Sequence, residues 1–234
     1  GPGGYLSWPY RPEGVMTGDS QRLADLERHG APMFGNVEVI FTQLHRFSDH
    51  LLRWQKVQNL VSRETPGDLW SRHILDSLQI LPLIGPVSGP LRILDIGSGG
   101  GFPAIPLAIA LQDVDFSMHL IESNTRKCAF LRAAAREFDL PITVHTARIE
   151  AVPPEIVGVV DLFTSRALAP LPLLLTYIHR FWSPQSRAIL HKGRENGEEL
   201  KSADSDWVYD VLKHQSATDK DGVLLEFSHL RPRT

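Results

Sequence analysis

Residues 91–106 read LRILDIGSGGGFPAIP, and this stretch determines how the rest of the chain is interpreted. An apolar segment leads to Asp95, glycine occupies four of the five positions from Gly97 to Gly101, and a second apolar segment begins near Pro103. This order predicts a strand, a tight turn and a helix. Because glycine has no Cβ atom and tolerates a positive φ, such a turn can bring its backbone against a bound small molecule.

Two cofactor classes use a glycine-rich turn of this kind. The dinucleotide pattern G-x-G-x-x-G would need a third glycine at position 102, which is Phe102, so a NAD-dependent function is disfavoured. An acid two residues before the first glycine is instead similar to the first motif of S-adenosylmethionine-dependent methyltransferases. That resemblance implies that Asp95, Gly97, Gly99 and Gly101 belong to the cofactor site. On this motif alone, an ordinary tight turn remains an alternative.

The next apolar segment, 116–121, ends in Glu122. An acid about twenty residues beyond the turn stands where nucleotide-binding folds accept hydrogen bonds from ribose hydroxyls. The alternative is that Glu122 caps a helix beginning near Asn124, since acids are common at helix starts.

The composition limits the possible functions. The 234 residues carry 24 Lys and Arg against 27 Asp and Glu, a formal charge of −3, so any RNA site must be a local patch. The single cysteine, Cys128, excludes an intrachain disulfide framework and a multi-cysteine zinc site, and fits a reducing cytoplasm. We expect no metal site. No apolar segment approaches the roughly eighteen residues of a membrane span.

The order of patterns predicts a helical extension before an α/β domain. Apolar residues at helical spacing predict a long amphipathic helix from Asn36 to Trp54. A second helix is expected to start at Thr65-Pro66-Gly67-Asp68 and to run to about Leu81. Prolines and glycines at 82–90 predict a linker. A short helix is expected from Asp19 to about His29. We therefore expect 1–18 to be disordered, 19–90 to form the helical extension, and 91–234 to form a Rossmann-like domain.

Within that domain, strands and helices alternate. Helices are expected at 103–112, 124–138 and 171–180, and strands at 116–121, 142–145, 160–165 and 187–191. Alternating strands and helices predict a parallel sheet with crossover helices. Two late segments, 207–212 and 223–227, predict a hairpin around residues 219–222.

One face of the long helix is basic. Arg46, Arg53 and Lys56, followed by Arg63, make the best candidate surface for contact with RNA. The alternative is a solvated helix face, softened by Asp49 and Glu64.

Several motifs together resemble the bacterial RsmG family, also called glucose-inhibited division protein B, the guanine-N7 methyltransferases of 16S ribosomal RNA. They cover about 36–200 and are, in order, RHILDS at 72–77, DIGSGGGFP at 95–103, RIE at 148–150, SRA at 165–167 and KG at 192–193. The resemblance implies a class I S-adenosylmethionine-dependent methyltransferase fold, with a mostly parallel seven-stranded sheet and an antiparallel terminal strand. It also implies methylation of guanine 527 in the 530 loop, with 16S ribosomal RNA or the small subunit as partner.

The same resemblance implies residue roles. Gly97 and Phe102 would line the cofactor, Ile149 and Glu150 would lie against its adenine end, and Arg166 would follow a core strand into the site. Two positions depart from the family pattern: Gly100 stands where many members have proline, and Glu122 where others often have aspartate. The first should loosen the turn without preventing binding.

The chemistry of guanine N7 sets what the site needs. N7 is a bare lone-pair acceptor, so no proton has to leave and no general base is required. We expect catalysis by alignment, with Arg166 and Lys192 holding the base or a phosphate, and with Arg72 and His73 among the substrate contacts. A cysteine nucleophile for cytosine C5 is disfavoured because Cys128 lies within an apolar helix, and Val152-Pro153-Pro154-Glu155 lacks both ends of the adenine-N6 tetrad.

Other interpretations stay open. Arg166 could form a core ion pair, and His73 is more typical of a structural hydrogen-bonding residue than of a base. The protein could be a non-catalytic cofactor-binding RNA-binding or assembly protein on the same scaffold, or, less favoured, a NAD-dependent oxidoreductase. We expect a monomer.

Overall fold

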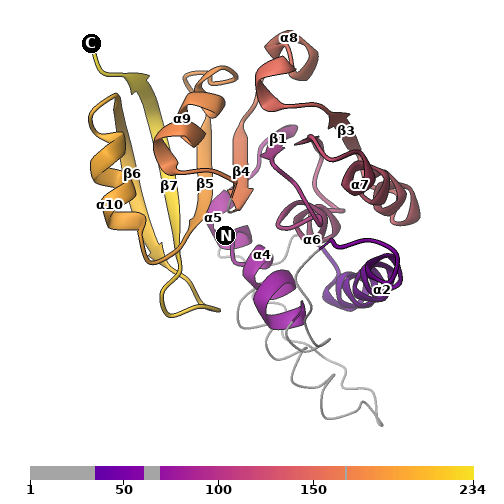
Figure 1. The fold of residues 1–234 in the computed structure, drawn as a ribbon. Helices are drawn as coiled ribbons and strands as arrows, with labels where there is room; N and C mark the ends of the chain where they lie inside the picture. Colours follow the sequence, from indigo (N-terminus) through magenta and orange to yellow (C-terminus); the bar gives the residue numbers. More distant parts are fainter. Residues whose placement is uncertain (1–34, 61–68, 167) are drawn as a thin grey trace.

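The computed structural model describes residues 35–60, 69–166 and 168–234. Its centre is a seven-stranded sheet in the order β3-β2-β1-β4-β5-β7-β6 (Figure 1). The first five strands pair in parallel, and β7 runs antiparallel to both β5 and β6. The strands are β1 (Leu91–Ile96), β2 (Phe116–Glu122), β3 (Ile142–Thr146), β4 (Leu162–Arg166), β5 (Arg187–Lys192), β6 (Trp207–Gln215) and β7 (Val223–Pro232).

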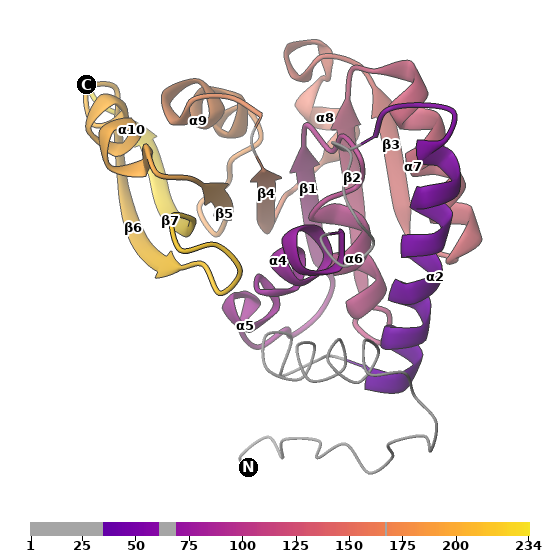
Figure 2. The same cartoon turned by 60° about the horizontal axis from the view of Figure 1, so that its bottom comes forward.

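Helices cover both faces of the sheet, and the two faces carry separate cores. Along β1, Leu91 and Ile93 join one hydrophobic cluster, whereas Leu94 and Ile96 join the other, as alternation along a strand requires. The first cluster packs under α2 (Val37–Gln55), α5 (Leu81–Ile84), α6 (Ala104–Ala110) and α7 (Thr125–Glu137), seen in Figure 2; the second packs under α9 (Leu171–His179) and α10 (Asn196–Ala203).

The long N-terminal helix forms as its pattern predicts. The Asn36 side chain accepts hydrogen bonds from the Glu38 and Val39 amides and so caps α2. Ile40, Leu44, Phe47 and Leu51 of its apolar stripe are fully buried, and the other apolar residues of the stripe are partly buried. Phe47 touches the rings of Phe102 and Phe130. The expected helix at 19–29 and the expected disorder of 1–18 lie outside the described residues.

The segment around Leu81 differs from its prediction. Instead of one regular helix, its described part has a π-helical turn, η1 (Trp70–Leu75), then α4 (Asp76–Leu78) and, after a turn, α5. Pro82, which the sequence pattern places in the linker, lies in the first turn of α5, where its missing amide N–H costs nothing. Isolated π-helical turns are frequent at functional sites.

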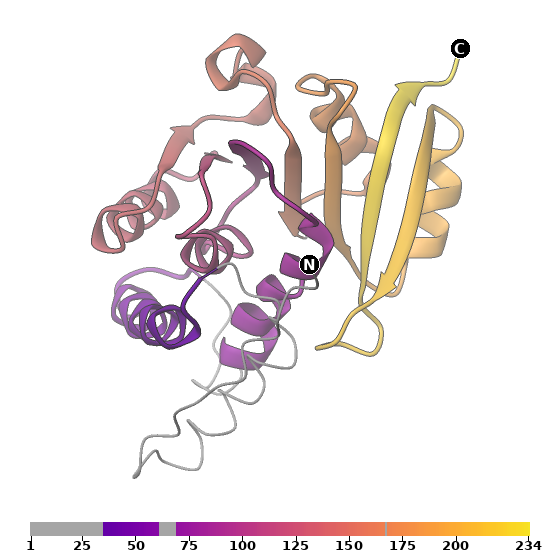
Figure 3. The ribbon, with the colours of Figure 1, turned by 180° about the vertical axis from the view of Figure 1, so that it is seen from behind.

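The domain otherwise follows the expected alternation, and the hairpin of β6 and β7 is confirmed. It closes the sheet at the end opposite α2 and α7 (Figure 3). The sequence patterns did not predict α10, nor the short helices η2 (Ile149–Ala151) and α8 (Pro154–Val157). In the ranges that the structure describes, no helix is both long and apolar enough to cross a membrane.

Candidate active site

The glycine turn after β1 is held from below by a buried carboxyl. Gly97, Gly99 and Gly101 all adopt positive φ, which confirms that the turn needs glycine. Beneath them Asp95 is 1% exposed and accepts hydrogen bonds of 2.6 Å from the hydroxyls of Ser98 and Thr164. Asp95 therefore fixes the turn to β4 rather than facing an open site.

Burial dominates the electrostatics of Asp95. It raises the pKa of this carboxyl from 3.8 to about 7, against the opposing effect of the hydrogen bonds from Ser98 and Thr164. The carboxyl thus titrates near neutral pH, well above the range of an exposed aspartate.

The Glu122 carboxylate, at the end of β2, connects this strand to the glycine turn through hydrogen bonds. Its Oε1 accepts a hydrogen bond of 2.9 Å from the Gly99 amide, and its Oε2 accepts one of 2.8 Å from the Asn124 amide. Asn124 itself caps α7 through the Lys127 amide. Glu122 therefore contacts the backbone on both sides of the site, and each oxygen keeps a lone pair for a further donor.

A recess of about 100 Å³ opens beside this carboxylate, between the ends of β1 and β2. Three of the expected cofactor residues besides Glu122 lie on its walls: Gly97, Ile149 and Glu150. A hydrogen bond from its own backbone amide, and after it one from the Tyr177 hydroxyl, lower the pKa of the Glu150 carboxyl. Leu168 lies over the turn, so close that a Cβ on Gly97 would be 2.6 Å from its Cδ1.

Two expected cofactor residues pack into the protein instead of lining the recess. A Cβ on Gly101 would lie 2.8 Å from Ile105 of α6, so this glycine permits close packing of turn and helix. Phe102 is 5% exposed and contacts Phe47 of α2 and the His73 ring. By contrast, among the described residues a Cβ on Gly99 would have only the Gly97 carbonyl oxygen within 4 Å, at 3.9 Å, so these residues leave the surface of the turn open there.

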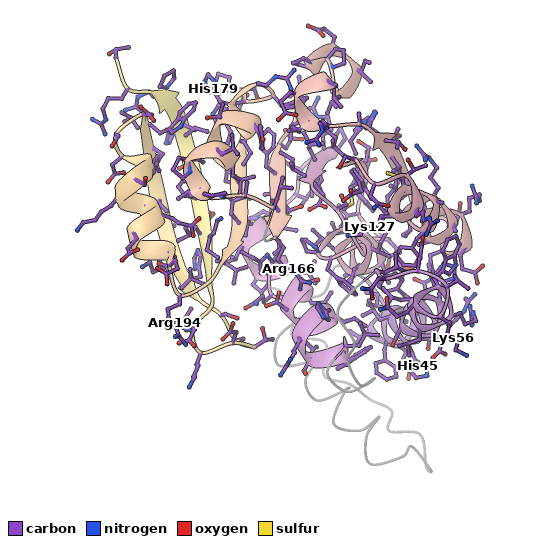
Figure 4. All side chains as sticks on the ribbon, in the orientation of Figure 1. His45, Lys56, Lys127, Arg166, His179 and Arg194 are labelled. Atoms are coloured by element: carbon purple, nitrogen blue, oxygen red, sulfur yellow. The ribbon has the colours of Figure 1, made fainter. Side chains whose placement is uncertain are left out.

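A larger cleft, of about 460 Å³, lies at the ends of β4 and β5. Arg166 ends β4 and Lys192 ends β5, and both line the cleft. Lys192 is 7% exposed, and its ammonium donates to the Ala169 carbonyl and to Glu199. Arg166 is more accessible, at 21%, and lies centrally among the strand ends in Figure 4.

The π-helical segment supplies the other wall. His73 Nδ1 lies 2.6 Å from Arg166 Nη2, and because a guanidinium only donates, Nδ1 is the acceptor. Arg72 is exposed and borders an adjoining hollow of about 520 Å³ with Thr218, Asp219 and Lys220. The structure thus brings Arg72, His73, Arg166 and Lys192 to one region.

The basic residues of α2 lie elsewhere. Arg53 and Lys56 are exposed. Lys56 directly follows the last residue of α2, and Figure 4 shows it well away from Arg166. Arg46 instead forms an ion pair of 3.1 Å with Glu137. Arg63 falls outside the described residues.

Sequence reasoning gave no role to several residues that shape the site. Asp76 and His191 line the cleft, Thr164 holds Asp95, and Leu168 covers Gly97. A signal existed for Asp76, which stands within the RHILDS motif, and for His191, which directly precedes Lys192. Cys128 is buried and its Sγ contacts the Glu122 carbonyl, which fits a packed residue and not a nucleophile.

The fold is shared with known methyltransferases. The O-methyltransferase from Bacillus cereus in complex with SAH superposes with a TM-score of 0.56 at 14% identity, covering 78% of this chain and 90% of that one. A putative O-methyltransferase from Klebsiella pneumoniae gives a TM-score of 0.55 at 15% identity, covering 90% and 98%. These similarities confirm the expected class I methyltransferase fold.

Sequence comparison is more specific. Residues 40–225 match the family GidB, rRNA small subunit methyltransferase G. The Ribosomal RNA small subunit methyltransferase G of Bartonella tribocorum is 45% identical over 189 residues, which cover 80% of this chain and 87% of that protein. That of Rhizobium meliloti is 42% identical over 196 residues, covering 82% and 90%. The chain therefore belongs to the GidB family of rRNA small subunit methyltransferases G, whose members use S-adenosylmethionine.

Proposed function

We propose that this protein transfers a methyl group from S-adenosylmethionine to N7 of a guanine in 16S ribosomal RNA, guanine 527 by family resemblance. The observation that carries the proposal is the placement of two hollows on either side of the point where the strand order reverses, between β1 and β4. In open α/β sheets, ligands bind at the carboxyl ends of the strands at this switch point.

The groups that line the recess suit the cofactor. Glu122 would accept hydrogen bonds from the ribose hydroxyls, Ile149 and Glu150 would border the adenine, and the open backbone at Gly99 would pass beneath the methionine part. The cofactor supplies a methyl group on a positively charged sulfur. At about 100 Å³ the recess is smaller than the roughly 300 Å³ of a small ligand site. Leu168 lines the recess beside Gly97, and we expect this exposed side chain to shift when the cofactor binds.

The cleft at Arg166 would receive the guanine. N7 attacks with its own lone pair, so the side chains need only align it with the methyl carbon and stabilise the charge that moves to the purine. The contact of His73 Nδ1 with Arg166 supports a structural role for that imidazole, because its lone pair is already engaged. Arg166 and Lys192 carry the positive charge that would hold guanine O6 or a phosphate.

The proposed partner is 16S ribosomal RNA, free or in the small subunit, bound by a cytoplasmic monomer. Arg53 and Lys56 on α2 are offered as phosphate contacts outside the cleft because both are exposed. Arg63 is proposed with them from sequence alone.

Transfer of labelled methyl from S-adenosylmethionine to small subunits that lack this modification tests the function. An N7-methylated guanine carries a fixed positive charge, so borohydride and aniline should cut the labelled RNA at one site. Single-turnover rates should be flat between pH 6 and 9, since no base is needed.

Three results would contradict the proposal. Saturable binding of S-adenosylhomocysteine without methyl transfer would favour a non-catalytic scaffold. Methylation with no aniline-sensitive site would exclude N7. Saturable binding of NAD in its place would favour an oxidoreductase.

A further inference from the structure

We propose that Asp76 is a positioning residue for methyl transfer: its carboxylate holds the Arg166 guanidinium at the wall of the cleft. The inference rests on the proposed function. Asp76 lies at the start of α4, in the helical segment before the sheet, and Arg166 ends β4, ninety positions later. Their contact is therefore a product of the tertiary fold.

The Asp76 carboxylate is 13% exposed and fully engaged. Its Oδ1 accepts from Gln79 Nε2 at 2.9 Å and from Thr218 Oγ1 at 2.7 Å, and its Oδ2 accepts from Arg166 Nη1 at 3.2 Å. Gln79 also accepts from the Ala217 amide. Thr218, in the turn between β6 and β7, thus holds Oδ1 of the carboxylate, while Oδ2 binds Arg166.

Charge in this cluster is balanced by Arg166. His191 is the other basic group on Asp76, with Nε2 3.1 Å from the Asp76 main-chain oxygen and 3.4 Å from Oδ2. Burial lowers the pKa of His191, so its ring is neutral near pH 7. The positive charge of the Arg166 guanidinium therefore balances the negative charge of Asp76. Removing the Asp76 carboxylate would leave Arg166 without this counter-ion.

The hydrogen bonds of Arg166 within the described residues involve two of its three guanidinium nitrogens. Nη1 donates to Asp76 and to the Arg72 carbonyl, Nη2 donates to His73, and Cζ lies 5.4 Å from the centre of the Phe102 ring. Across residues 35–60, 69–166 and 168–234, Nε–H has no hydrogen-bond partner. Nη1 and Nη2 are thus engaged within the protein, and Nε–H is a donor for an oxygen acceptor of the RNA.

A double-mutant cycle tests this inference. Single-turnover methyl transfer to small subunits lacking the modification would be measured for wild type, Asp76→Asn, Arg166→Ala and the double variant. Asp76→Asn removes the negative charge beside Arg166, and its NH2 group must face a donor, either Arg166 Nη1 or Gln79 Nε2. The rate should therefore fall about 100-fold, as it does when a catalytic contact is displaced. The rate of Arg166→Ala should fall by a similar factor. The rate of the double variant should be no lower than that of Arg166→Ala alone.

The outcomes separate the inference from the proposed function. If wild type fails to methylate N7, the proposed function fails. If wild type is active and the two losses multiply to about 10⁴-fold, Asp76 acts independently of Arg166 and the inference is overturned. Affinity for S-adenosylhomocysteine, measured by calorimetry, is the control for folding. It should stay within about twofold in every variant, whereas a variant that does not fold would lose this affinity together with its activity.

A milder pair of variants covers the case in which Asp76→Asn does not fold. Thr218→Val removes one donor to Oδ1 and should slow transfer about threefold to tenfold, the equivalent of one lost hydrogen bond. This loss should vanish in the Arg166→Ala background. Thr176→Val, at an exposed position of α9 away from the cluster, is the matched control and should leave the rate unchanged. Equal losses from Thr218→Val in both backgrounds would overturn the inference.

Discussion

Asp95 and Gly99 occupy the two sides of one turn and have opposite environments. Asp95 is buried beneath the backbone of the turn and accepts hydrogen bonds from two hydroxyls. Gly99 lies on the other side of the turn, where the described residues leave open space. Burial therefore controls the pKa of Asp95. The absence of a side chain at Gly99 leaves room for a bound molecule. Each makes a separate prediction.

The pKa of Asp95 makes the stability of the protein depend on pH. The folded form holds its proton up to about pH 7, whereas the unfolded chain releases it near pH 4, so folding binds a proton in this window. The contribution of Asp95 to the free energy of unfolding must then fall as pH rises from 4 to 7, by at most about 4 kcal/mol. Asp95→Asn should remove this loss, so its stability relative to wild type should rise between pH 5 and pH 8 in urea denaturation. A constant difference would contradict the assignment.

Gly99 and Gly101 should respond differently to substitution. Gly99→Asp places a carboxylate in the open space beside Glu122, so affinity for S-adenosylhomocysteine should fall about 100-fold or more while the fold persists. Gly101→Ala instead forces a Cβ to within 2.8 Å of Ile105 and should lower the melting temperature. Calorimetric titration and circular dichroism distinguish the two. A native Gly99→Asp protein with unchanged affinity would show that this turn does not hold the cofactor.

At the scale of elements, α2 combines a buried side with a charged end. Its buried residues pack against α6 and α7. Its C-terminal end exposes Arg53 and Lys56, for which the described part of the chain supplies no ion pair. This differs from Arg46, whose charge is paired with Glu137. Positive charge that the described residues leave unpaired supports the proposed RNA contact at this end of α2.

Charge reversal tests this face of α2. The double variant Arg53→Glu, Lys56→Glu should weaken RNA binding and reduce the slope of log affinity against log salt by roughly 0.7 to 0.9 for each lost phosphate contact. Cofactor affinity should not change. The matched control is Lys213→Glu, Arg231→Glu, which makes the same charge change on the hairpin of β6 and β7. Equal effects from both variants would indicate a general charge effect and not a phosphate site.

At the scale of the whole molecule, the helical extension and the sheet share a core. One hydrophobic cluster joins residues of α2, α5 and α6 with residues of β1 and β2. Phe47 of α2 is its link, with ring contacts to Phe102, Phe130 and Phe138. A helix bound this way should not detach before the sheet unfolds.

Phe47→Ala should therefore destabilise the entire protein. The expected loss is about 3–5 kcal/mol in the free energy of unfolding, typical of a buried aromatic replaced by alanine. Unfolding in urea should remain a single transition by fluorescence and by circular dichroism. Val39→Ala, on the exposed side of α2, should change stability by less than about 0.5 kcal/mol. Two separate transitions in wild type would show that α2 and the sheet fold independently.

Local patterns in the sequence were enough to predict the sheet, its crossover helices, the glycine turn and the acid at the end of β2. These features depend on residues close together in the chain, where spacing and backbone freedom decide the structure. The family motifs, which are also local, were enough to single out Arg166 and Lys192.

Only the tertiary structure decided how those residues are used. It buried Phe102 between α2 and His73, engaged Lys192 with Glu199, placed Leu168 over Gly97, and joined Asp76 to Arg166. Most of these contacts join elements far apart in the sequence, so no periodicity or local spacing records them. The pKa of Asp95 is the same kind of result, because it follows from how completely the folded chain excludes water.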